Sequence, residues 1–387
     1  MAERWLVGLS EYAGLTRYTG GIGTHFASLL PAIVELGIEV DLVMFSPERL
    51  QRERTLGGVN LIANYRLAGL PEWARLLARA LLLRRQFRSS RYDRVFLPEW
   101  GGIAAALPTG APLVTNLATG VRLGDWIAGR RIRDYPRKRW VARVVQDYLE
   151  TRQIRRSRGV VSISRAVLEW NRMNVAGLPP AAVVRNCVDV DAVREAAAGV
   201  EPDREHPVIL FLGRLERRKG IVPTMRAFAE LVDEHPDARL QLAGSTGDSR
   251  FEPSRQELLA MVPEQHRGQV EFLGHLDSAT LFRRVAAATV VLCPSLWEGF
   301  GNVALEVKAA GVPLVVTSGS GFDDFCRNGD DCLVVPPDDA HALAEAVSRI
   351  IGSPELAARL VATAERNVNS FAPAAVAPDL VAAVGRF

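Results

Sequence analysis

The sequence is poor in cysteine, and the few cysteines present follow no binding pattern. Cys187, Cys293, Cys326 and Cys332 are the only four in 387 residues. They form no C-x-x-C pair, and no histidine stands at zinc-finger spacing from any of them. Neither a disulfide framework nor a zinc site is indicated. We interpret the four as buried or incidental thiols, and we expect neither a bound metal nor a cofactor.

Long apolar runs and secretory signals are also missing. A helix that crosses a bilayer needs about 20 consecutive apolar residues. The most apolar helical stretch, residues 73–87, is interrupted by Arg75 and Arg79 and closed by Arg84 and Arg85. The N-terminal MAERWLVGLSEYAG has no basic segment followed by an apolar one. We therefore expect a cytoplasmic protein.

The net charge is only +3, but the two halves of the chain differ strongly. Residues 1–190 carry 28 Lys and Arg against 16 Asp and Glu, whereas residues 191–387 carry 19 against 28. A basic first half indicates either an anionic partner, such as phosphate, a membrane surface or an acidic substrate, or simply an arginine-rich solvated surface. No nucleic-acid recognition motif accompanies the charge, so we expect no nucleic-acid partner.

Short apolar segments alternate with helix-like segments along the whole chain. In the first half, the helical spacing of residues 23–37 lies between two strand-like runs and ends at Gly37. Intervening helices and β-branched runs predict an α/β fold of two doubly wound, Rossmann-like domains with parallel sheets that face each other across a cleft. The expected strands are 4–10, 39–45, 94–98, 112–118, 159–165, 207–213, 239–244, 269–274, 289–295, 312–318 and 332–337.

A short polar stretch with a proline, residues 198–207, separates the two series of strands. We place the hinge within residues 187–206. The first domain then covers residues 1–187 and the second covers 188–371. A final helix, about 372–387, is expected to return to the first domain. Ligands belong at the carboxyl ends of the strands, between the domains.

The segment EGFGNVALE, from Glu298 to Glu306, places two glutamates on either side of a glycine loop. The preceding strand should end near Ser295 and the following helix should begin near Val303. Backbone N–H groups at the start of a helix form a ready anion site, for which phosphate is the natural occupant. A fixed carboxylate holds hydroxyl groups well, so Glu298 is expected to hold a sugar and Glu306 a ribose. Together they predict a nucleotide-sugar site.

This segment resembles a known family. The E-x7-E spacing within PSLWEGFGNVALEVKAAGVPLVV is similar to the donor-site motif of the retaining family-four glycosyltransferases. The resemblance implies the GT-B fold, a nucleotide diphospho-sugar donor and no required divalent ion. It also implies donor contacts from the backbone of Gly299, Phe300, Gly301 and Asn302.

Two further segments match the family in order. FLGRLERRKG, residues 211–220, is similar to the segment that supplies the cations for the diphosphate, here Arg214 and Lys219. YTGGIGTHF, residues 18–26, resembles the N-terminal glycine loop, in which Gly21 and Gly23 would let the backbone approach the donor phosphates. Residues 183–193 resemble the interdomain segment, with Cys187 in place of the usual glycine, and we assign them a structural role.

One position departs from the family pattern. Many relatives carry a histidine at the end of the strand 112–118, where this chain has Ala118. Either the local alignment is shifted, or a contact to the transferred sugar is missing. For each of the six histidines of the chain, we expect a structural role rather than a catalytic one.

The resemblance implies a retaining hexosyltransferase in which Glu298, Arg214 and Lys219 act at the reaction centre and an unknown acceptor hydroxyl receives the sugar. A nucleotide-sugar epimerase, a pseudo-glycosidic coupling enzyme and a non-catalytic nucleotide-sugar-binding protein remain as alternatives. The basic segments 73–91 and 130–146 indicate either peripheral contact with the inner membrane face, near a lipid-linked or anionic acceptor, or core-packed helices with a solvated arginine face.

Overall fold

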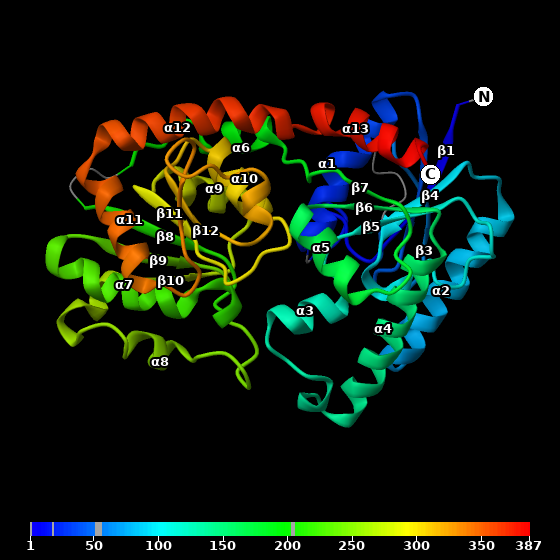
Figure 1. The fold of residues 1–387 in the computed structure, drawn as a ribbon, viewed down its shortest axis with the longest axis horizontal. Coiled ribbons are helices and arrows are strands. Elements are labelled where there is room, and N and C mark those ends of the chain that lie inside the picture. The colour runs from blue at the N-terminus through cyan, green and yellow to red at the C-terminus, as the bar shows by residue number, and fades with distance from the viewer. Residues whose placement is uncertain (1, 18, 51–55, 203–205) are drawn as a thin grey trace. The chain divides into compact units, whose positions relative to one another are not determined.

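A computed structural model describes residues 2–17, 19–50, 56–202 and 206–387. These residues form two compact units, each built around its own sheet (Figure 1). The first unit contains residues up to Cys187 together with Pro373–Phe387, and the second contains Val188–Ala372. We describe each unit by itself.

The first unit is a parallel sheet of seven strands in the order β3-β2-β1-β4-β5-β6-β7. The sheet order reverses between β1 and β4, the point at which ligands of doubly wound folds bind. Its strands are β1 (Arg4–Leu9), β2 (Glu39–Met44), β3 (Asn60–Asn64), β4 (Arg94–Pro98), β5 (Leu113–Leu117), β6 (Gly159–Ser162) and β7 (Ala181–Val183). Its helices are α1 (Gly21–Glu35), α2 (Glu72–Ser89), α3 (Val121–Ile127), α4 (Arg137–Arg156), α5 (Arg165–Asn174) and α13 (Pro373–Gly385).

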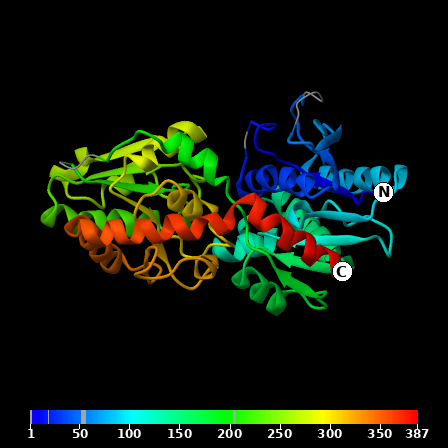
Figure 2. The same cartoon turned by 90° about the horizontal axis from the view of Figure 1, so that it is seen from above.

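Alternation along β1 explains why both faces of this sheet are covered. Val7 packs into a cluster with Phe26 of α1 and Leu380 of α13. Its neighbour Leu6 packs on the other face, with Leu83 of α2. Successive side chains of a strand point to opposite faces, so an unbroken apolar strand needs a helix layer on each side. The contact of α13 with α1 brings the last helix into the first unit (Figure 2).

The second unit is a parallel sheet of six strands in the order β10-β9-β8-β11-β12-β13. Phe211 of β8 and Phe228 of α7 are fully buried in its main core, with Val347 of α11. Its strands are β8 (Val208–Leu212), β9 (Arg239–Ala243), β10 (Val270–Gly274), β11 (Val290–Cys293), β12 (Leu314–Thr317) and β13 (Leu333–Val335). Its helices are α6 (Val190–Ala197), α7 (Ile221–Glu234), α8 (Arg255–Leu259), α9 (Ser278–Ala286), α10 (Asn302–Ala309), α11 (Ala340–Gly352) and α12 (Pro354–Val368).

The prediction of two doubly wound parallel sheets is confirmed, and the strands missed from the sequence are the two edges of the first sheet. β3 has only one buried residue, Ala63, and β7 has none. An edge strand has a neighbouring strand on one side only and is less buried. It therefore lacks the apolar run that identifies a central strand. The α1 helix starts two residues before the expected segment and ends at Glu35, before Gly37, whose φ of 84° stops it.

No single helix of the described residues is long and apolar enough to cross a membrane, although the consecutive segments Pro354–Phe371 and Pro373–Gly385 meet that test as a pair. Apolar residues of both segments are buried in the cores of the two units. Leu360 and Val368 are buried in the second unit, and Leu380 and Val384 are buried in the first.

Candidate active site

The glycine loop that follows β11 packs against a second loop, which contains Gly321 and Phe322. Gly301 has a φ of 99° and stands immediately before α10, so it takes a backbone conformation that L side chains rarely adopt. A Cβ at this position would lie 2.2 Å from Cε1 of Phe322. The N–H of Gly321 donates to the carbonyl of Glu298 at 2.9 Å. These contacts fix the path of the loop and the position at which α10 begins.

Phe300, which the resemblance places among the donor contacts, points its ring away from the loop surface. It is 2% exposed, and its ring lies 4.8 Å from that of Phe325 and 6.5 Å from that of Phe371. The side chain of Phe300 is therefore inaccessible, and only its backbone remains for contact with a ligand. The ring anchors the loop.

Lys219 and Glu298 form an ion pair at the carboxyl ends of two neighbouring strands. Lys219 follows β8 and Glu298 follows β11, and these strands pair directly. The ammonium donates to Oε2 of Glu298, and the Ser295 hydroxyl donates to the same oxygen at 3.2 Å. Both side chains are about four-fifths buried. Burial alone would raise the pKa of Glu298, but Lys219 and then Arg218 lower it below its ordinary value. Glu298 is therefore ionised.

Arg214 is paired with a carboxylate that the sequence analysis did not identify. Its guanidinium lies 2.9 Å from Oε1 of Glu216, and the guanidinium of Arg218 lies 2.7 Å from Oε2 of the same residue. The Glu216 side chain is 7% exposed, whereas that of Arg214 is 56% exposed. Glu216 thus holds two arginines beside the end of β8, with Arg214 facing solvent. The only signal in the sequence is an acidic residue within a basic run.

Glu306 lies on α10, two turns into the helix. Its carboxylate makes no hydrogen bond or ion pair with any residue in the described ranges, and burial raises its pKa to about 7. The residue is half-buried, and its carboxylate has open acceptor positions for hydroxyl groups.

A buried lysine ties α10 to the loop that supports the glycines. The ammonium of Lys308 lies 2.9 Å from Oδ2 of Asp331 and donates at 2.9 Å to the carbonyl of Phe325. Both charged side chains are at most 2% exposed. Burial would raise the pKa of Asp331, but Lys308 lowers it. The pair is ionic, and it links α10 to the segment that follows Phe322, the residue that packs against Gly301.

In the first unit, the glycine loop packs against a carboxylate of the protein. Glu11 accepts from the N–H of Gly20 at 3.1 Å and from that of Gly23 at 2.9 Å. A Cβ at Gly23 would lie 2.7 Å from Cγ2 of Thr19 and 2.9 Å from Cγ of Glu11. Gly21 is the first residue of α1. Contacts within the protein therefore require the small residue at position 23. Tyr18 lies outside the described residues.

His25 and Cys187, from two of the matched segments, contact each other. The N–H of Cys187 donates to Nδ1 of His25 at 3.3 Å, and the thiol lies 3.5 Å from the same nitrogen. His25 is buried, which lowers its pKa to about 4, so the imidazole is neutral. Asp189 accepts from the N–H of Ala192 and caps α6. These contacts are structural.

A carboxylate that the sequence analysis missed lies beside Ala118. Both oxygens of Glu99, which follows β4, accept from the N–H of Ala118, at 3.0 and 2.8 Å. Glu99 is 2% exposed, and burial raises its pKa to about 7, although the backbone N–H groups oppose the shift. The position where many relatives carry a histidine therefore has a methyl group next to a buried acid.

A second buried acid, Glu150 of α4, lies close to Glu99. It accepts from the N–H groups of Gly101 at 2.9 Å and Val121 at 2.6 Å and from the amide of Gln146 at 2.7 Å. Burial raises its pKa to about 8, and the charge of Glu99 adds to the shift. Repulsion between two buried carboxylates favours protonation of one of them.

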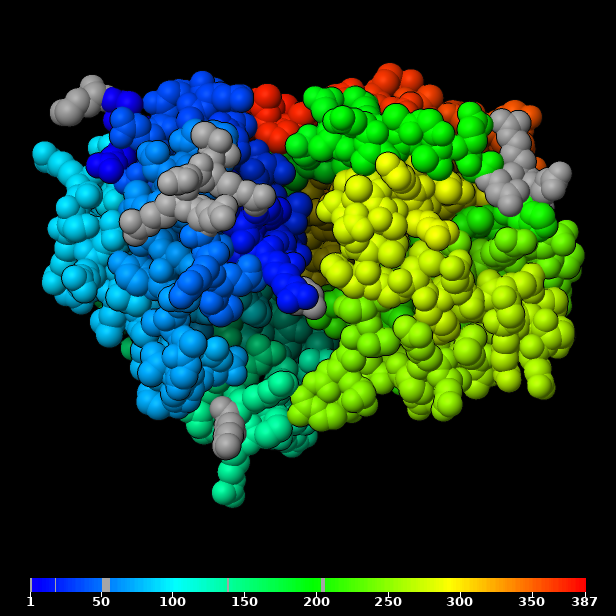
Figure 3. All heavy atoms as spheres, turned by 180° about the vertical axis from the view of Figure 1, so that it is seen from behind, coloured from blue at the N-terminus to red at the C-terminus, as the bar shows by residue number. Residues whose placement is uncertain are grey.

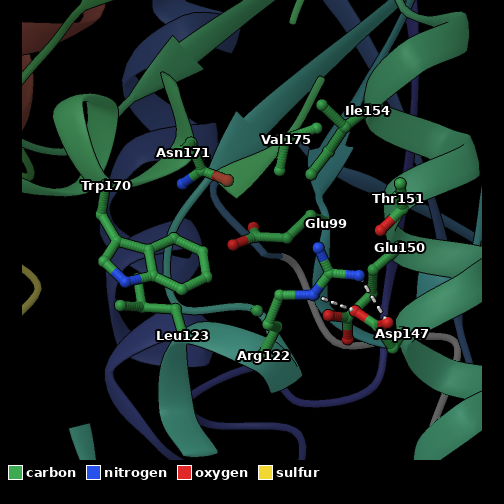
Figure 4. Close-up of a pocket in the computed structure, with 11 residues that line it drawn as sticks. Glu99, Arg122, Leu123, Asp147, Glu150, Thr151, Ile154, Trp170, Asn171 and Val175 are labelled. Atoms are coloured by element: carbon green, nitrogen blue, oxygen red, sulfur yellow. Dashed lines mark hydrogen bonds and ion pairs between the residues drawn. The ribbon is translucent and has the colours of Figure 1, made fainter. Parts of the chain in front are cut away.

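These acids line a small pocket of the first unit (Figure 4). Arg122, bound to both carboxylate oxygens of Asp147 at 2.9 and 2.7 Å, covers one side, and Trp170 covers another. The space open to the centre of a water molecule is about 20 Å³. This space holds about one water molecule and no sugar ring.

The comparison with known proteins agrees with the architecture. The chain aligns with sucrose-phosphate synthase from Thermosynechococcus elongatus with a TM-score of 0.77, at 20% identity over 99% of both chains. HepE from Anabaena, solved in complex with UDP-glucose, aligns with a TM-score of 0.68 at 15% identity over 99% of this chain and 100% of that one. The fold is the GT-B fold.

Sequence comparison gives the kind of enzyme. Residues 19–192 match the family model described as Glycosyltransferase Family 4, and residues 206–353 match the model described as Glycosyl transferases group 1. The chain is 28% identical to the glycogen synthase of Mycobacterium tuberculosis over 380 residues, which cover 91% of this chain and 87% of the relative. Models of glycosyltransferases therefore match both halves of the chain, which supports a glycosyltransferase with the GT-B fold.

Proposed function

We propose that the protein is a retaining glycosyltransferase that moves a hexose from a nucleotide diphospho-sugar to an acceptor hydroxyl, without a metal ion. The observation that carries the proposal is the grouping of Lys219, Glu298 and the start of α10 at adjacent strand ends of the second unit. The UDP-glucose held by HepE supports a nucleotide sugar as the donor. The second unit is then the donor domain and the first unit the acceptor domain.

In this proposal the diphosphate binds at the start of α10, where backbone N–H groups face it. Arg214 is largely exposed and Lys219 lies on the adjacent strand end, so both are placed to add positive charge. As the bond between the sugar and the phosphate lengthens, negative charge grows on the leaving diphosphate, and these cations stabilise it. A donor phosphate oxygen takes the proton of the acceptor hydroxyl, so no protein base is required and Ala118 is compatible with turnover.

In the structure, Lys219 and Glu298 form an ion pair. When the diphosphate binds, Lys219 gains a second anion, and the Glu298 carboxylate then has acceptor positions open for sugar hydroxyls. Glu306, which has no hydrogen-bond or ion-pair partner among the described residues, takes the ribose hydroxyls. Glu298 acts on the transferred sugar, and Glu306 acts only on binding.

The test is a thermal-shift panel of nucleoside diphosphates and nucleotide sugars without added metal, run on the wild type and on Glu306→Gln and Arg214→Gln. We expect one nucleotide to raise the melting temperature of the wild type and to lose most of this effect in both variants. Addition of a chelator should leave the shift unchanged. A folded wild type that no nucleotide stabilises would contradict the proposal.

A further inference from the structure

Large apolar side chains are exposed mainly in one part of the first unit. We call this part the α2/α4 surface. It consists of the exposed large apolar side chains of α2 and of the segment just before it. It also includes those of α3, of α4 and of the turn between α3 and α4. Elsewhere in the described chain, exposed large apolar side chains are scattered, at Leu36, Trp100, Met173 and Val183. The members of the α2/α4 surface are Leu70, Trp73, Leu77, Leu81, Trp126, Ile132, Trp140, Val141, Val144 and Tyr148.

The apolar residues of α4 lie along one line of the helix. Trp140, Val144 and Tyr148 follow each other at a spacing of four residues and are 45%, 39% and 61% exposed. Residues four apart share a helix face. The opposite face is buried through Ala142 and Leu149. The helix therefore has one apolar face in the core and a second one in solvent.

The α2 helix repeats this arrangement. Trp73, Leu77 and Leu81 are again four residues apart and are exposed, while Leu76 and Leu83 on the other side are buried. Leu76 packs against Leu149 of α4. The two helices are thus neighbours in one unit (Figure 1), and Figure 3 shows the light-blue α2 segment at the molecular surface.

Positive charge surrounds both apolar lines. Residues 72–89 contain five arginines and one acidic residue, and residues 121–156 contain eleven basic and four acidic residues. Arg85 and Arg88 follow Leu81 on the same face of α2, and Arg137 precedes Trp140 on that of α4. Most of the positive charge of the first half of the sequence is found in these segments and the turn before α4.

We propose that the α2/α4 surface docks on an anionic lipid bilayer. Tryptophan and tyrosine are favoured at the membrane–water interface, and basic residues beside them are attracted to anionic lipid head groups. Aligned apolar lines with arginine at their ends are typical of helices that lie in the plane of that interface. A nucleic acid would match the charge but not the apolar lines. Isolated exposed apolar residues need no explanation, but a line of them on each of two neighbouring helices does.

The test is flotation of the full chain with vesicles of phosphatidylcholine alone or mixed equally with phosphatidylglycerol. We expect flotation with the anionic vesicles, little with the neutral ones, and release as salt is raised. Tryptophan fluorescence should shift to the blue on binding, because Trp73 and Trp140 leave water. Binding does not require sugar transfer, so this result and the donor test succeed or fail separately.

Two variants separate the apolar and the charged contributions. Trp140→Ser with Tyr148→Ser should weaken binding to anionic vesicles at least tenfold, and Arg85→Gln with Arg137→Gln should weaken it by roughly fivefold per arginine. Met173→Ser, which removes the most exposed apolar side chain outside the surface, and Arg226→Gln on α7 serve as matched controls. Donor-induced thermal shifts should be unchanged in all four.

Three outcomes would overturn the proposal. They are equal flotation with neutral and anionic vesicles, unchanged flotation of the Trp140 and Tyr148 variant, and no flotation at all. Sedimentation of the wild type without lipid measures whether the surface binds a second copy of the chain instead of a bilayer. A concentration-dependent dimer abolished in the Trp140 and Tyr148 variant would assign the surface to a second copy of the chain instead.

Discussion

The Lys219 ammonium donates to the Glu298 carboxylate across two adjacent strand ends, although 79 residues separate them in the chain. The pair brings together one residue expected to hold phosphate and one expected to hold sugar. Their charges compensate each other, which reduces the cost of burying both side chains. The pair therefore holds the segments that follow β8 and β11 together.

Glu298→Gln should reduce turnover about 100-fold or more while changing the thermal stability little, because the amide keeps the shape but loses the charge and one acceptor. The measurement is kcat for sugar transfer beside a melting curve. Glu264→Gln, an exposed glutamate on the same unit, is the control. A turnover close to that of the wild type would remove Glu298 from the reaction centre.

The double variant Lys219→Met with Glu298→Gln distinguishes two explanations of the pair. If Glu298 only positions Lys219, the double variant should turn over as slowly as Lys219→Met alone. We expect it to be slower, because each residue contacts a different part of the donor. Kinetics of the three variants, measured in parallel, give the answer.

Donor affinity should increase between pH 6 and pH 8. Burial raises the pKa of Glu306 to about 7, and the ionised carboxylate accepts hydroxyl hydrogen bonds better than the protonated acid. Rising pH therefore favours the binding form, and the dissociation constant should fall by up to about tenfold. Glu306→Gln, which does not titrate, should bind weakly with no such slope. Calorimetric titration at three pH values checks this, and identical slopes in the two proteins would contradict it.

Glu99→Gln should flatten the dependence of stability on pH. The folded-state pKa of Glu99, about 7, lies above its ordinary value of 4.5. Between these values the folded state binds more protons than the unfolded state, so the free energy of unfolding falls as pH rises. The wild type should lose about 1–3 kcal/mol from this group between pH 5 and pH 8. Denaturant unfolding at both pH values gives the difference, and an equal loss in the variant would reject the assignment.

Lys308→Met should destabilise the second unit by about 3–5 kcal/mol, because it leaves the buried Asp331 carboxylate without its counter-ion. Adding Asp331→Asn should recover much of this loss, because the buried charge is then removed as well. Both are measured by denaturant unfolding. A double variant less stable than Lys308→Met would show that the charge is not the cause.

The fold was predictable because most strands of both sheets are unbroken apolar runs, of which β8 and β11 are clear examples. The partners of the site residues could not be predicted from the sequence. Glu298 and Lys219 meet only because β8 and β11 are adjacent in the sheet, and Glu99 reaches Ala118 only because β4 pairs with β5. Sequence spacing within one segment contains no information about the order of strands.

The glycines show a second limit of sequence reasoning. Their pattern indicates close approach of the backbone to something, and a ligand was the expected neighbour. At Gly23 and Gly301 the structure places protein atoms there, from Glu11 and Phe322. A glycine pattern identifies a crowded position but does not identify what crowds it.

The placement of α13 has a consequence for synthesis of the chain. The core of the first unit contains Leu380 and Val384, and the ring of Phe387 lies against Gly159. A ribosome makes these residues after the whole of the second unit, which is continuous from Val188 to Ala372. Domains of most chains fold from the N-terminus as they emerge. Here the second unit is complete first, and the first unit exposes part of its core until Pro373–Phe387 have been made.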